Sequence, residues 1–225
     1  MWIGGLQKFS LIDYPGKLSC VLFTRGCNFR CRYCHNPELV LPDKYCPVIS
    51  EDKVMEFLKT RTDYLDGVVI SGGEPTIQQD LVSFLGKLKH LGYLVKLDTN
   101  GSHPDVLKQV INLKLVNYIA MDVKAPLRQY RDTIAVPFDI EKIEESINIL
   151  NNSEIKHEFR TTVVRHLCMY HDICKIVDMI GKNQKYSIQK ARIDEHILDK
   201  ELLQQEQYSE DEFHRLKFML EEMHL

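Results

Sequence analysis

The sequence predicts an α/β protein built on a parallel sheet, because two patterns alternate along its 225 residues. Short runs rich in β-branched residues predict strands, and the segments between them carry apolar residues at helical spacing. Repeated strand–helix–strand units form parallel sheets, and the connections here are too short for a second domain. The predicted strands are Ser19–Thr24, Gly67–Ser71, Tyr93–Asp98, Val116–Asp122, His157–Val164 and Tyr186–Lys190. Periodicity leaves a flat sheet and a curved, barrel-like sheet both open, but either one binds ligands beyond the carboxyl ends of its strands.

The helices are predicted in order from apolar stripes and capping residues. The first, Glu51–Thr60, follows a serine that suits an N-cap and carries two acidic residues in its first turn. Further apolar stripes at helical spacing predict helices over 81–88, 143–150 and 173–180. A last helix begins at the capping box Ser209–Glu212. The polar stretch Ala191–Tyr208 before it is the best candidate for a flexible linker.

The composition excludes several classes of protein. Lys and Arg number 29 against 32 Asp and Glu, so the net charge of −3 gives no strong basic field for nucleic acid. No apolar run approaches the roughly 18 residues of a membrane span, and the first residues lack the layout of a secretory signal. We therefore expect a cytoplasmic enzyme without nucleic-acid or membrane partners. Its core domain should cover residues 1–190, including an N-terminal extension, with the linker and a packed C-terminal helix over 191–225.

Seven cysteines point to metal or redox chemistry, because an odd number without a visible export signal argues against a disulfide framework. Cys27, Cys31 and Cys34 lie in one loop after the first strand. A zinc site completed by His35 or a distant cysteine, a c-type haem attachment and a thioredoxin-like pair all remain open. The spacing favours a [4Fe–4S] cluster held by three cysteines, in which the fourth iron stays open to a small molecule.

A second motif, Gly72-Gly73-Glu74-Pro75, follows the second predicted strand. Glycines allow a ligand to approach the backbone closely, and carbonyl groups with the Glu74 carboxylate suit an ammonium group. Alone, this motif is typical of a simple turn. Together with the cysteine spacing and with Tyr33 before the last cysteine, it resembles the radical S-adenosylmethionine (AdoMet) superfamily.

Four further stretches narrow this resemblance. They are Leu6–Lys17, Leu97–Gly101, Ala120–Pro126 and Glu158–Val163. In this order they are similar to the activating enzymes of glycyl radical enzymes, most closely to the anaerobic ribonucleoside-triphosphate reductase activating proteins. Pyruvate formate-lyase activase is a more distant relative. The resemblance runs from about Gln7 to Gln189, and it implies an incomplete (β/α)6 barrel of parallel strands with its cofactors at their carboxyl ends.

The resemblance also implies the role of each candidate site residue. Cys27, Cys31 and Cys34 would be the metal ligands and the catalytic centre, where the reduced cluster cleaves AdoMet to methionine and a 5′-deoxyadenosyl radical. The implied AdoMet-binding residues are Tyr33, Asn36, Gly72, Gly73, Glu74, Asp98, Thr99, Asp122, Lys124, Arg160 and Gln189.

Several of these residues keep a structural alternative. Asn36 also suits a simple turn before a proline, and the acids at strand ends also suit helix caps. In pyruvate formate-lyase activase the positions of Asp98, Thr99 and Asp122 hold a monovalent cation, so the resemblance implies that such a cation is a candidate cofactor here. Gln189 stands alone where the family often has two glutamines.

The function implied by the resemblance is to remove a hydrogen atom from a glycine of a partner enzyme. The implied partners are a glycyl radical enzyme, first of all anaerobic ribonucleotide reductase, and a flavodoxin or ferredoxin-type electron donor. One alternative is a radical AdoMet enzyme that acts on a small molecule or a peptide. Another is a zinc-binding, non-catalytic interaction module. The remaining cysteines, Cys46, Cys168 and Cys174 among them, suggest no second cluster.

Overall fold

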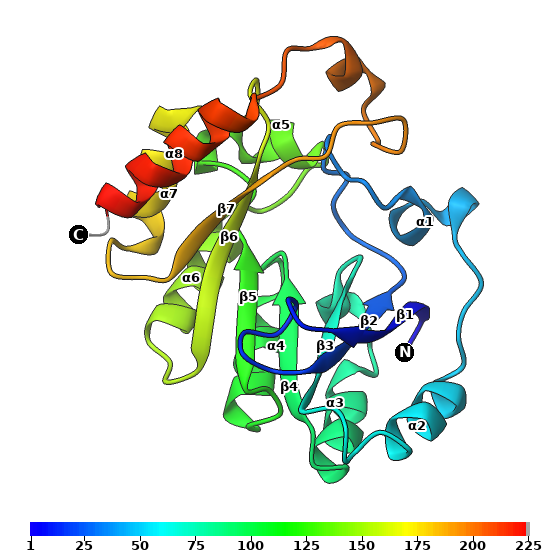
Figure 1. The fold of residues 1–225 in the computed structure, drawn as a ribbon. Helices are drawn as coiled ribbons and strands as arrows, with labels where there is room; N and C mark the ends of the chain where they lie inside the picture. The colour runs from blue at the N-terminus through cyan, green and yellow to red at the C-terminus, as the bar shows by residue number, and fades with distance from the viewer. Residues whose placement is uncertain (224–225) are drawn as a thin grey trace.

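The computed structural model describes residues 1–223, which form one seven-stranded sheet in the order β1 to β7 (Figure 1). The strands are β1 (Ile3–Ser10), β2 (Ser19–Thr24), β3 (Gly67–Gly72), β4 (Leu94–Thr99), β5 (Tyr118–Asp122), β6 (Lys156–Val163) and β7 (Tyr186–Lys190). From β2 to β7 every neighbouring pair is parallel, and β1 pairs antiparallel with β2. The sheet is an open, curved partial barrel, because β1 and β7 each pair on one side only.

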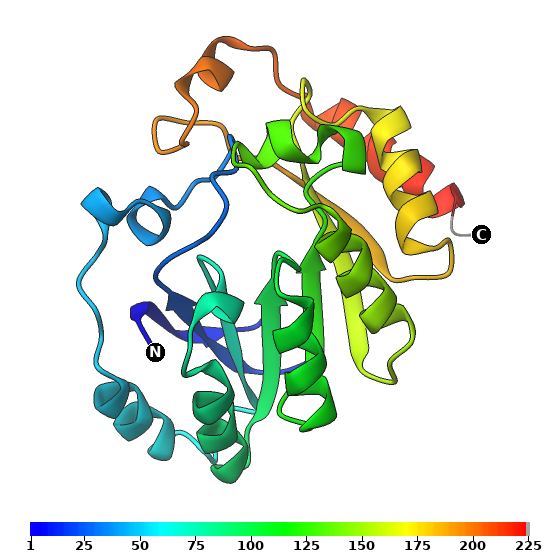
Figure 2. The same ribbon diagram turned by 180° about the vertical axis from the view of Figure 1, so that it is seen from behind.

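The helices are α1 (Pro37–Val40), α2 (Glu51–Lys59), α3 (Leu81–His90), α4 (Pro104–Asn112), α5 (Tyr130–Ile134), α6 (Glu141–Asn151), α7 (Tyr170–Ile180) and α8 (Glu210–Met223). Most of them cover the outer face of the sheet, whereas α1 and α5 lie toward the carboxyl ends of the strands (Figure 2). The capping box that begins α8 is formed, since Ser209 N donates to Glu212 Oε2 at 2.8 Å and Glu212 N donates to Ser209 Oγ at 3.2 Å. No helix of the described chain is long and apolar enough to cross a bilayer.

The six predicted strands are confirmed to within two residues at each end, and β1 is the strand that the sequence analysis missed. Its middle residues are only half buried or exposed, so it lacks an alternating pattern. Gly4 and Gly5 are also poor strand residues on propensity. Here they are needed for space: a Cβ at Gly4 would lie 2.8 Å from the Cys46 sulfur. Tertiary packing therefore produces a strand that local propensity does not favour.

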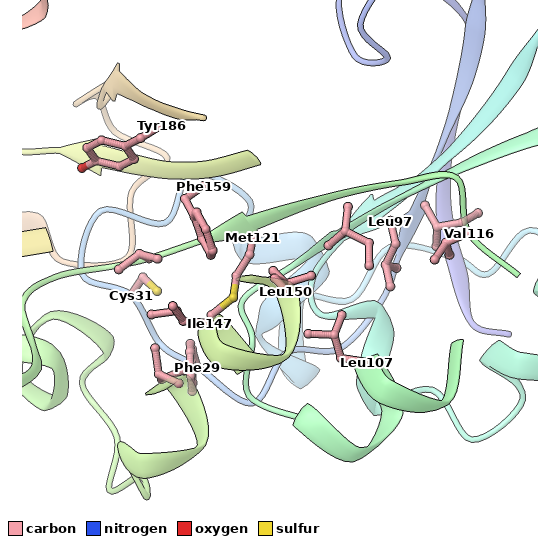
Figure 3. Packing of buried hydrophobic residues seen from close by; sticks show 14 of the residues in the cluster. Phe29, Cys31, Leu97, Leu107, Val116, Met121, Ile147, Leu150, Phe159 and Tyr186 are labelled. Carbon is pink, nitrogen blue, oxygen red and sulfur yellow. The ribbon is translucent and has the colours of Figure 1, made fainter. Parts of the chain in front are cut away.

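The main hydrophobic core lies between the outer face of the sheet and the helices. Figure 3 shows how the cysteine loop takes part in it: Phe29 and Cys31 lie near Ile147 of α6 and Met121 of β5. A smaller cluster on the inner face, which includes Tyr14, packs at the amino ends of the strands. The inner face is thus filled by apolar side chains at one end, and the polar residues gather at the carboxyl end.

Residues 191–209, which we call the strap, arch above the carboxyl ends of the strands (Figure 1, orange). They contain the short 3-10 helix η4 (Lys200–Gln204). Leu198 N donates to Cys34 O at 3.1 Å, and Asp199 N donates to Arg32 O at 2.9 Å. An ion pair of 2.5 Å between Arg32 Nε and Asp199 Oδ2 completes the contact. The segment predicted as a flexible linker is therefore bonded to the cysteine loop.

Candidate active site

A cavity of about 240 Å³ lies at the carboxyl ends of β3, β4 and β5. Its lining residues are Cys27, Phe29, Cys31, Tyr33, Cys34, Asn36, Val40, Ser71, Gly72, Gly73, Glu74, Asp98, Thr99, Asn100, Asp122 and Lys124. The structure thus brings together every predicted site residue except Arg160 and Gln189. Arg160 stands directly behind the lining and pairs with Asp122, whereas Gln189 is exposed on β7 and is not among the lining residues.

The cysteine loop is held by backbone hydrogen bonds. Cys34 N donates to Cys31 O at 2.9 Å, which forms a turn. Arg30 N and Arg32 N donate to carbonyls of α5, at 2.9 and 3.1 Å. All seven cysteines lie in the described chain, and none of them forms a disulfide. The three cavity thiols therefore sit on a fixed loop and are not engaged in disulfides.

The side-chain arrangement does not converge on a single ion. Among the described residues, no three His, Cys, Asp or Glu side chains are close enough to bind one metal ion together. His35 is bonded to Asp194 of the strap at 2.8 Å, and it does not line the cavity. A cube-shaped cluster makes a different demand, because each thiolate binds its own iron. The donor set thus fits a cluster better than the zinc site that would use His35.

Burial keeps the cavity thiols protonated. Desolvation raises the pKa of Cys27 to about 12 and that of Cys31 to about 11, and it raises the pKa of Cys34 as well. The Lys124 ammonium group opposes this effect at all three thiols. Thiolates are the form that binds iron, so a positively charged group must compensate for burial when they ionise. Lys124 supplies part of that compensation.

Tyr33 contributes a buried polar atom without a hydrogen-bond partner among the described residues. Its ring lines the cavity, and desolvation raises the pKa of its hydroxyl well above the ordinary value. An unsatisfied buried hydroxyl is costly and calls for a partner. A bound polar ligand in this cavity would supply one.

Glu74 is saturated by protein donors. Its Oε1 accepts from Thr76 N at 3.1 Å, from Thr76 Oγ1 at 2.5 Å and from Thr99 Oγ1 at 2.7 Å, and its Oε2 accepts from Asn100 N at 2.7 Å. This carboxylate therefore ties the end of β3 to the end of β4. Desolvation still raises its pKa. A direct bond from Glu74 to an ammonium group stays a prediction.

The two glycines before Glu74 meet neighbouring backbone. A Cβ at Gly73 would lie 2.0 Å from Gly26 O, and one at Gly72 would lie 2.3 Å from Thr24 N. Gly72 also has a φ of +113°, which L side chains rarely adopt. Both glycines thus let the loop after β3 pack directly on the chain that leads into the cysteine loop.

The acids at the strand ends belong to a network of ion pairs. Asp98 pairs with Lys96 at 2.5 Å and with Arg160 at 3.5 Å. Asp122 pairs with Lys124 at 3.0 Å and with Arg160 at 2.9 Å. Burial alone would raise the pKa of Asp122, but Arg160 and Lys124 outweigh it and hold that pKa below its usual range. Protein cations therefore face both acids, and they hold Asp122 as a carboxylate.

Sequence reasoning missed the lining residues Phe29, Val40, Ser71 and Asn100, and also Lys96, which pairs with Asp98. Asn100 lines the cavity, and its side-chain Nδ2 lies 3.0 Å from Asn28 Oδ1 and 4.0 Å from Cys27 Sγ. Its position directly after β4 was an available signal. Lys96 was missed because a lysine three residues before the end of a strand is typical of a surface position. Asn36 precedes α1 without a side-chain capping bond, so the structural alternative for its side chain is not realised.

Comparison with known proteins identifies the family of this chain. The family model for the radical SAM superfamily matches residues 21–180, which span β2 to α7. The chain belongs to the radical SAM superfamily. Membership implies an enzyme that uses a [4Fe–4S] cluster and S-adenosylmethionine, and the cavity gathers the residue types that these cofactors need.

Proteins of similar sequence assign this radical SAM enzyme to a narrower family. A "Putative glycyl-radical enzyme activating enzyme" of Methanocaldococcus jannaschii is 36% identical over 194 residues, which cover 84% of this chain and 79% of that protein. A pyruvate formate-lyase-activating enzyme of Streptococcus mutans is 33% identical over 102 residues, 43% of this chain and 38% of that protein. The chain thus belongs to the glycyl-radical enzyme activating enzymes.

Solved structures agree on the fold. SuiB of Streptococcus suis superposes with a TM-score of 0.69 at 15% identity, over 90% of this chain and 45% of SuiB. The S-adenosylmethionine-bound form of SuiB gives a TM-score of 0.66 at 16% identity, over 87% of this chain and 44% of that chain. The radical SAM chain spans less than half of SuiB, and at this identity the likeness concerns the fold alone.

Proposed function

We propose that this radical SAM enzyme removes a hydrogen atom from a backbone glycine of a partner enzyme and leaves a stored glycyl radical there. The observation that carries the proposal is the meeting of three free thiols and the Gly72–Glu74 loop in one cavity. The relative in Methanocaldococcus jannaschii supports the class of partner. The resemblance to anaerobic ribonucleoside-triphosphate reductase activating proteins supports that reductase as the partner.

In this proposal the cysteine loop holds the cluster. Cys27, Cys31 and Cys34 would each bind one iron, and the fourth iron would face the cavity. When bound, the cluster and AdoMet supply the one-electron chemistry that removes the hydrogen atom. Cys31 is buried and Cys27 and Cys34 are half-buried, which limits the access of water to the reacting centre. A flavodoxin or a ferredoxin would supply the electron.

The other lining residues would bind AdoMet. Backbone carbonyls of the Gly72–Glu74 loop suit its ammonium group, and the charged network at Asp98 and Asp122 suits its carboxylate. Tyr33 would pack near the adenine, with Asn36 and Thr99 as further polar contacts. Gln189 is the weakest assignment, because it is exposed and lies outside the lining.

The size of the cavity supports a macromolecular substrate. Its volume of about 240 Å³ is below the ~300–1,000 Å³ that sites for drug-sized ligands occupy. The cluster and AdoMet would occupy this space together, and little would remain for a second small substrate. A glycine on a flexible segment of a partner needs almost no side-chain space, and the open edges of the sheet leave a route for it. The first dozen residues and the strap are the candidate docking surfaces.

The test combines cofactor content with a radical signal. Anaerobic, reconstituted protein should hold about four irons per chain. With reductant, AdoMet and anaerobic ribonucleotide reductase, it should produce a glycyl radical doublet in the electron paramagnetic resonance spectrum. The Cys31→Ala variant should lose both signals. Cys168→Ala, a buried cysteine away from the cavity, is the matched control and should keep both.

Two results would contradict the proposal. A colourless protein with stoichiometric zinc would favour the interaction module. Rapid stoichiometric turnover of a small metabolite, without any partner protein, would favour a small-molecule enzyme.

A further inference from the structure

A lysine is buried on the inner face of the sheet, directly below the cavity. Lys96 lies on β4 and is 1% exposed. Its Nζ lies 2.5 Å from Asp98 Oδ1, two residues further along the same strand. Residues two apart on a strand point to the same side. A lysine is almost never fully buried unless it is paired, so its partner accounts for its presence.

The pairing extends across three strands and leaves no carboxylate oxygen of the two acids unused. Asp98 Oδ1 faces Lys96, and Asp98 Oδ2 faces the Arg160 NH2 group at 3.5 Å. Asp122 Oδ1 faces Arg160 Nε at 2.9 Å, and Asp122 Oδ2 faces Lys124 Nζ at 3.0 Å. We call these five residues the charge network. It contains three cations and two carboxylates, and so carries one net positive charge.

This arrangement conflicts with a bound monovalent cation at Asp98 and Asp122. Two bare carboxylates beside an anionic ligand would repel it, and a bridging sodium or potassium ion would relieve the repulsion. Here each oxygen that such an ion would bind already faces a protein cation. A further ion would be repelled by the net positive charge of the network. The residues therefore do not fit a cation site.

An acid on the neighbouring strand does not change this balance. Glu158 of β6 lies two residues before Arg160 and pairs with Lys185 at 3.1 Å. That pair is neutral as a unit, so it leaves the net charge of the network unchanged. Glu74 also lines the cavity, but hydrogen bonds from Thr76, Thr99 and Asn100 already engage its carboxylate. No oxygen of Asp98 or Asp122 is left without a protein cation beside it.

We infer that Lys96, together with Arg160 and Lys124, takes the place of a monovalent cation, so that the AdoMet carboxylate binds here without sodium or potassium. The inference rests on the proposed function for the presence of AdoMet. Lys96 acts as a positioning residue, because it is not among the residues that line the cavity and works through Asp98.

The first experiment needs no AdoMet and no activity. The melting temperature of the purified protein is measured in choline, sodium and potassium chloride at equal ionic strength. The native protein should melt at the same temperature in all three salts. The Lys96→Met variant keeps the shape of the side chain but frees Asp98 Oδ1, so potassium or sodium should raise its melting temperature in a saturable way.

The second experiment measures AdoMet binding to the reconstituted protein by calorimetry in the same salts. The native affinity should be equal in all of them. For Lys96→Met we expect affinity in choline to fall about tenfold, as loss of a charge-assisted hydrogen bond predicts, with partial recovery in potassium. Lys87→Met, which removes a lysine from a more exposed pair with Glu51 on the outer helices, is the matched control and should behave as the native protein does.

If Lys96→Met fails to fold, the double variant Lys96→Met, Asp98→Asn removes the pair as a unit and should show no salt response. A saturable potassium or sodium response of the native protein would overturn the inference, and so would a Lys96→Met variant that folds and is indifferent to the salt. Absence of AdoMet binding in every salt would instead contradict the proposed function, because the melting experiment would still decide the role of Lys96.

Discussion

At the scale of single residues, Gly73 is the position where the cavity tolerates least change. Its backbone conformation is open to other residues, since its φ is not positive. What excludes a side chain is contact with backbone: the added Cβ would lie 2.0 Å from Gly26 O. Backbone atoms cannot rotate away as a flexible side chain can, so one of the two loops must move.

We expect Gly73→Ala to destabilise the protein by about 1–3 kcal/mol, as overpacking does, and to weaken AdoMet binding. At roughly 2–4 °C per kcal/mol for a domain of this size, the melting temperature should fall by several degrees. Gly86→Ala is the control, because nothing lies within 4 Å of the added Cβ on α3, and it should raise stability by about 0.5–1 kcal/mol. Equal melting temperatures for the two variants would show that the contact at Gly73 relaxes freely.

How far the site could be predicted from the sequence also depends on single residues. The spacing of the cysteines within one loop is enough to identify Cys27, Cys31 and Cys34 as site residues. The two glycines before Glu74 identify it in the same way. Lys96 could not be identified in this way, because its role arises from Arg160, which is 64 positions away in the sequence and meets it only through Asp98. Spacing reveals what one loop holds, and it cannot reveal which charges different strands bring together.

At the scale of elements, the strap is the segment whose contacts could not be predicted from composition. It is polar and lacks periodicity, which is typical of a linker. Its order comes from partners distant in the sequence, in particular the Arg32–Asp199 ion pair and the bond from Leu198 N to Cys34 O. These contacts therefore stabilise the positions of both the strap and the cysteine loop.

We expect Asp199→Asn to loosen the strap. The variant keeps an oxygen that can accept from Glu201 N, so the start of η4 is preserved while the ion pair is lost. Because both partners are partly exposed, the cost in the free energy of unfolding should be only about 1 kcal/mol. Hydrogen exchange should nevertheless accelerate at the amides of residues 198 and 199, which donate to the cysteine loop.

The control uses the same arginine. Glu201 lies 3.7 Å from Arg32 and its side chain is 83% exposed, so Glu201→Gln should leave these amides protected. If these amides exchange at the same rate in both variants, the Arg32–Asp199 ion pair does not hold the strap in place.

At the scale of the whole molecule, many weakly acidic groups are buried in their neutral form. Burial raises the pKa of Cys20 from 9.0 to about 12, and that of Cys168 likewise. Burial also raises the pKa of Tyr14 and of Tyr93 to about 12. In the unfolded chain these groups lose their protons at lower pH than in the folded one. The stability that they contribute is therefore complete below about pH 9 and is lost as the pH rises toward 12.

We expect the free energy of unfolding of the cofactor-free protein, measured with urea, to decline steadily above pH 9. Cys20→Ala removes one of these groups. Its curve should fall less steeply, by about 1.4 kcal/mol per pH unit for one proton. A slope identical to that of the native protein would show that Cys20 does not contribute to the alkaline loss of stability.

The overall architecture could be predicted better than any single contact, because six strands with alternating helices leave few topologies. The antiparallel strand at the edge of the sheet could not be predicted in this way. The antiparallel strand β1 depends on Gly4 and Gly5 fitting against Cys46 and Phe23, and neither partner is evident from local pattern. The curvature of the sheet likewise came from resemblance and not from periodicity.

The anchoring of the cysteine loop has a consequence for how cofactor loading proceeds. Bonds from Arg30 N and Arg32 N to α5, and from Leu198 N to Cys34 O, come from the polypeptide alone. Ordering a residue costs about 1–2 kcal/mol of backbone entropy, and here folding of the chain bears that cost for the loop. Cluster insertion would then be a docking event on a loop that is already folded, without coupled folding. Delivery can follow synthesis at any time, and a chain that has lost its cluster keeps the shape needed to accept another.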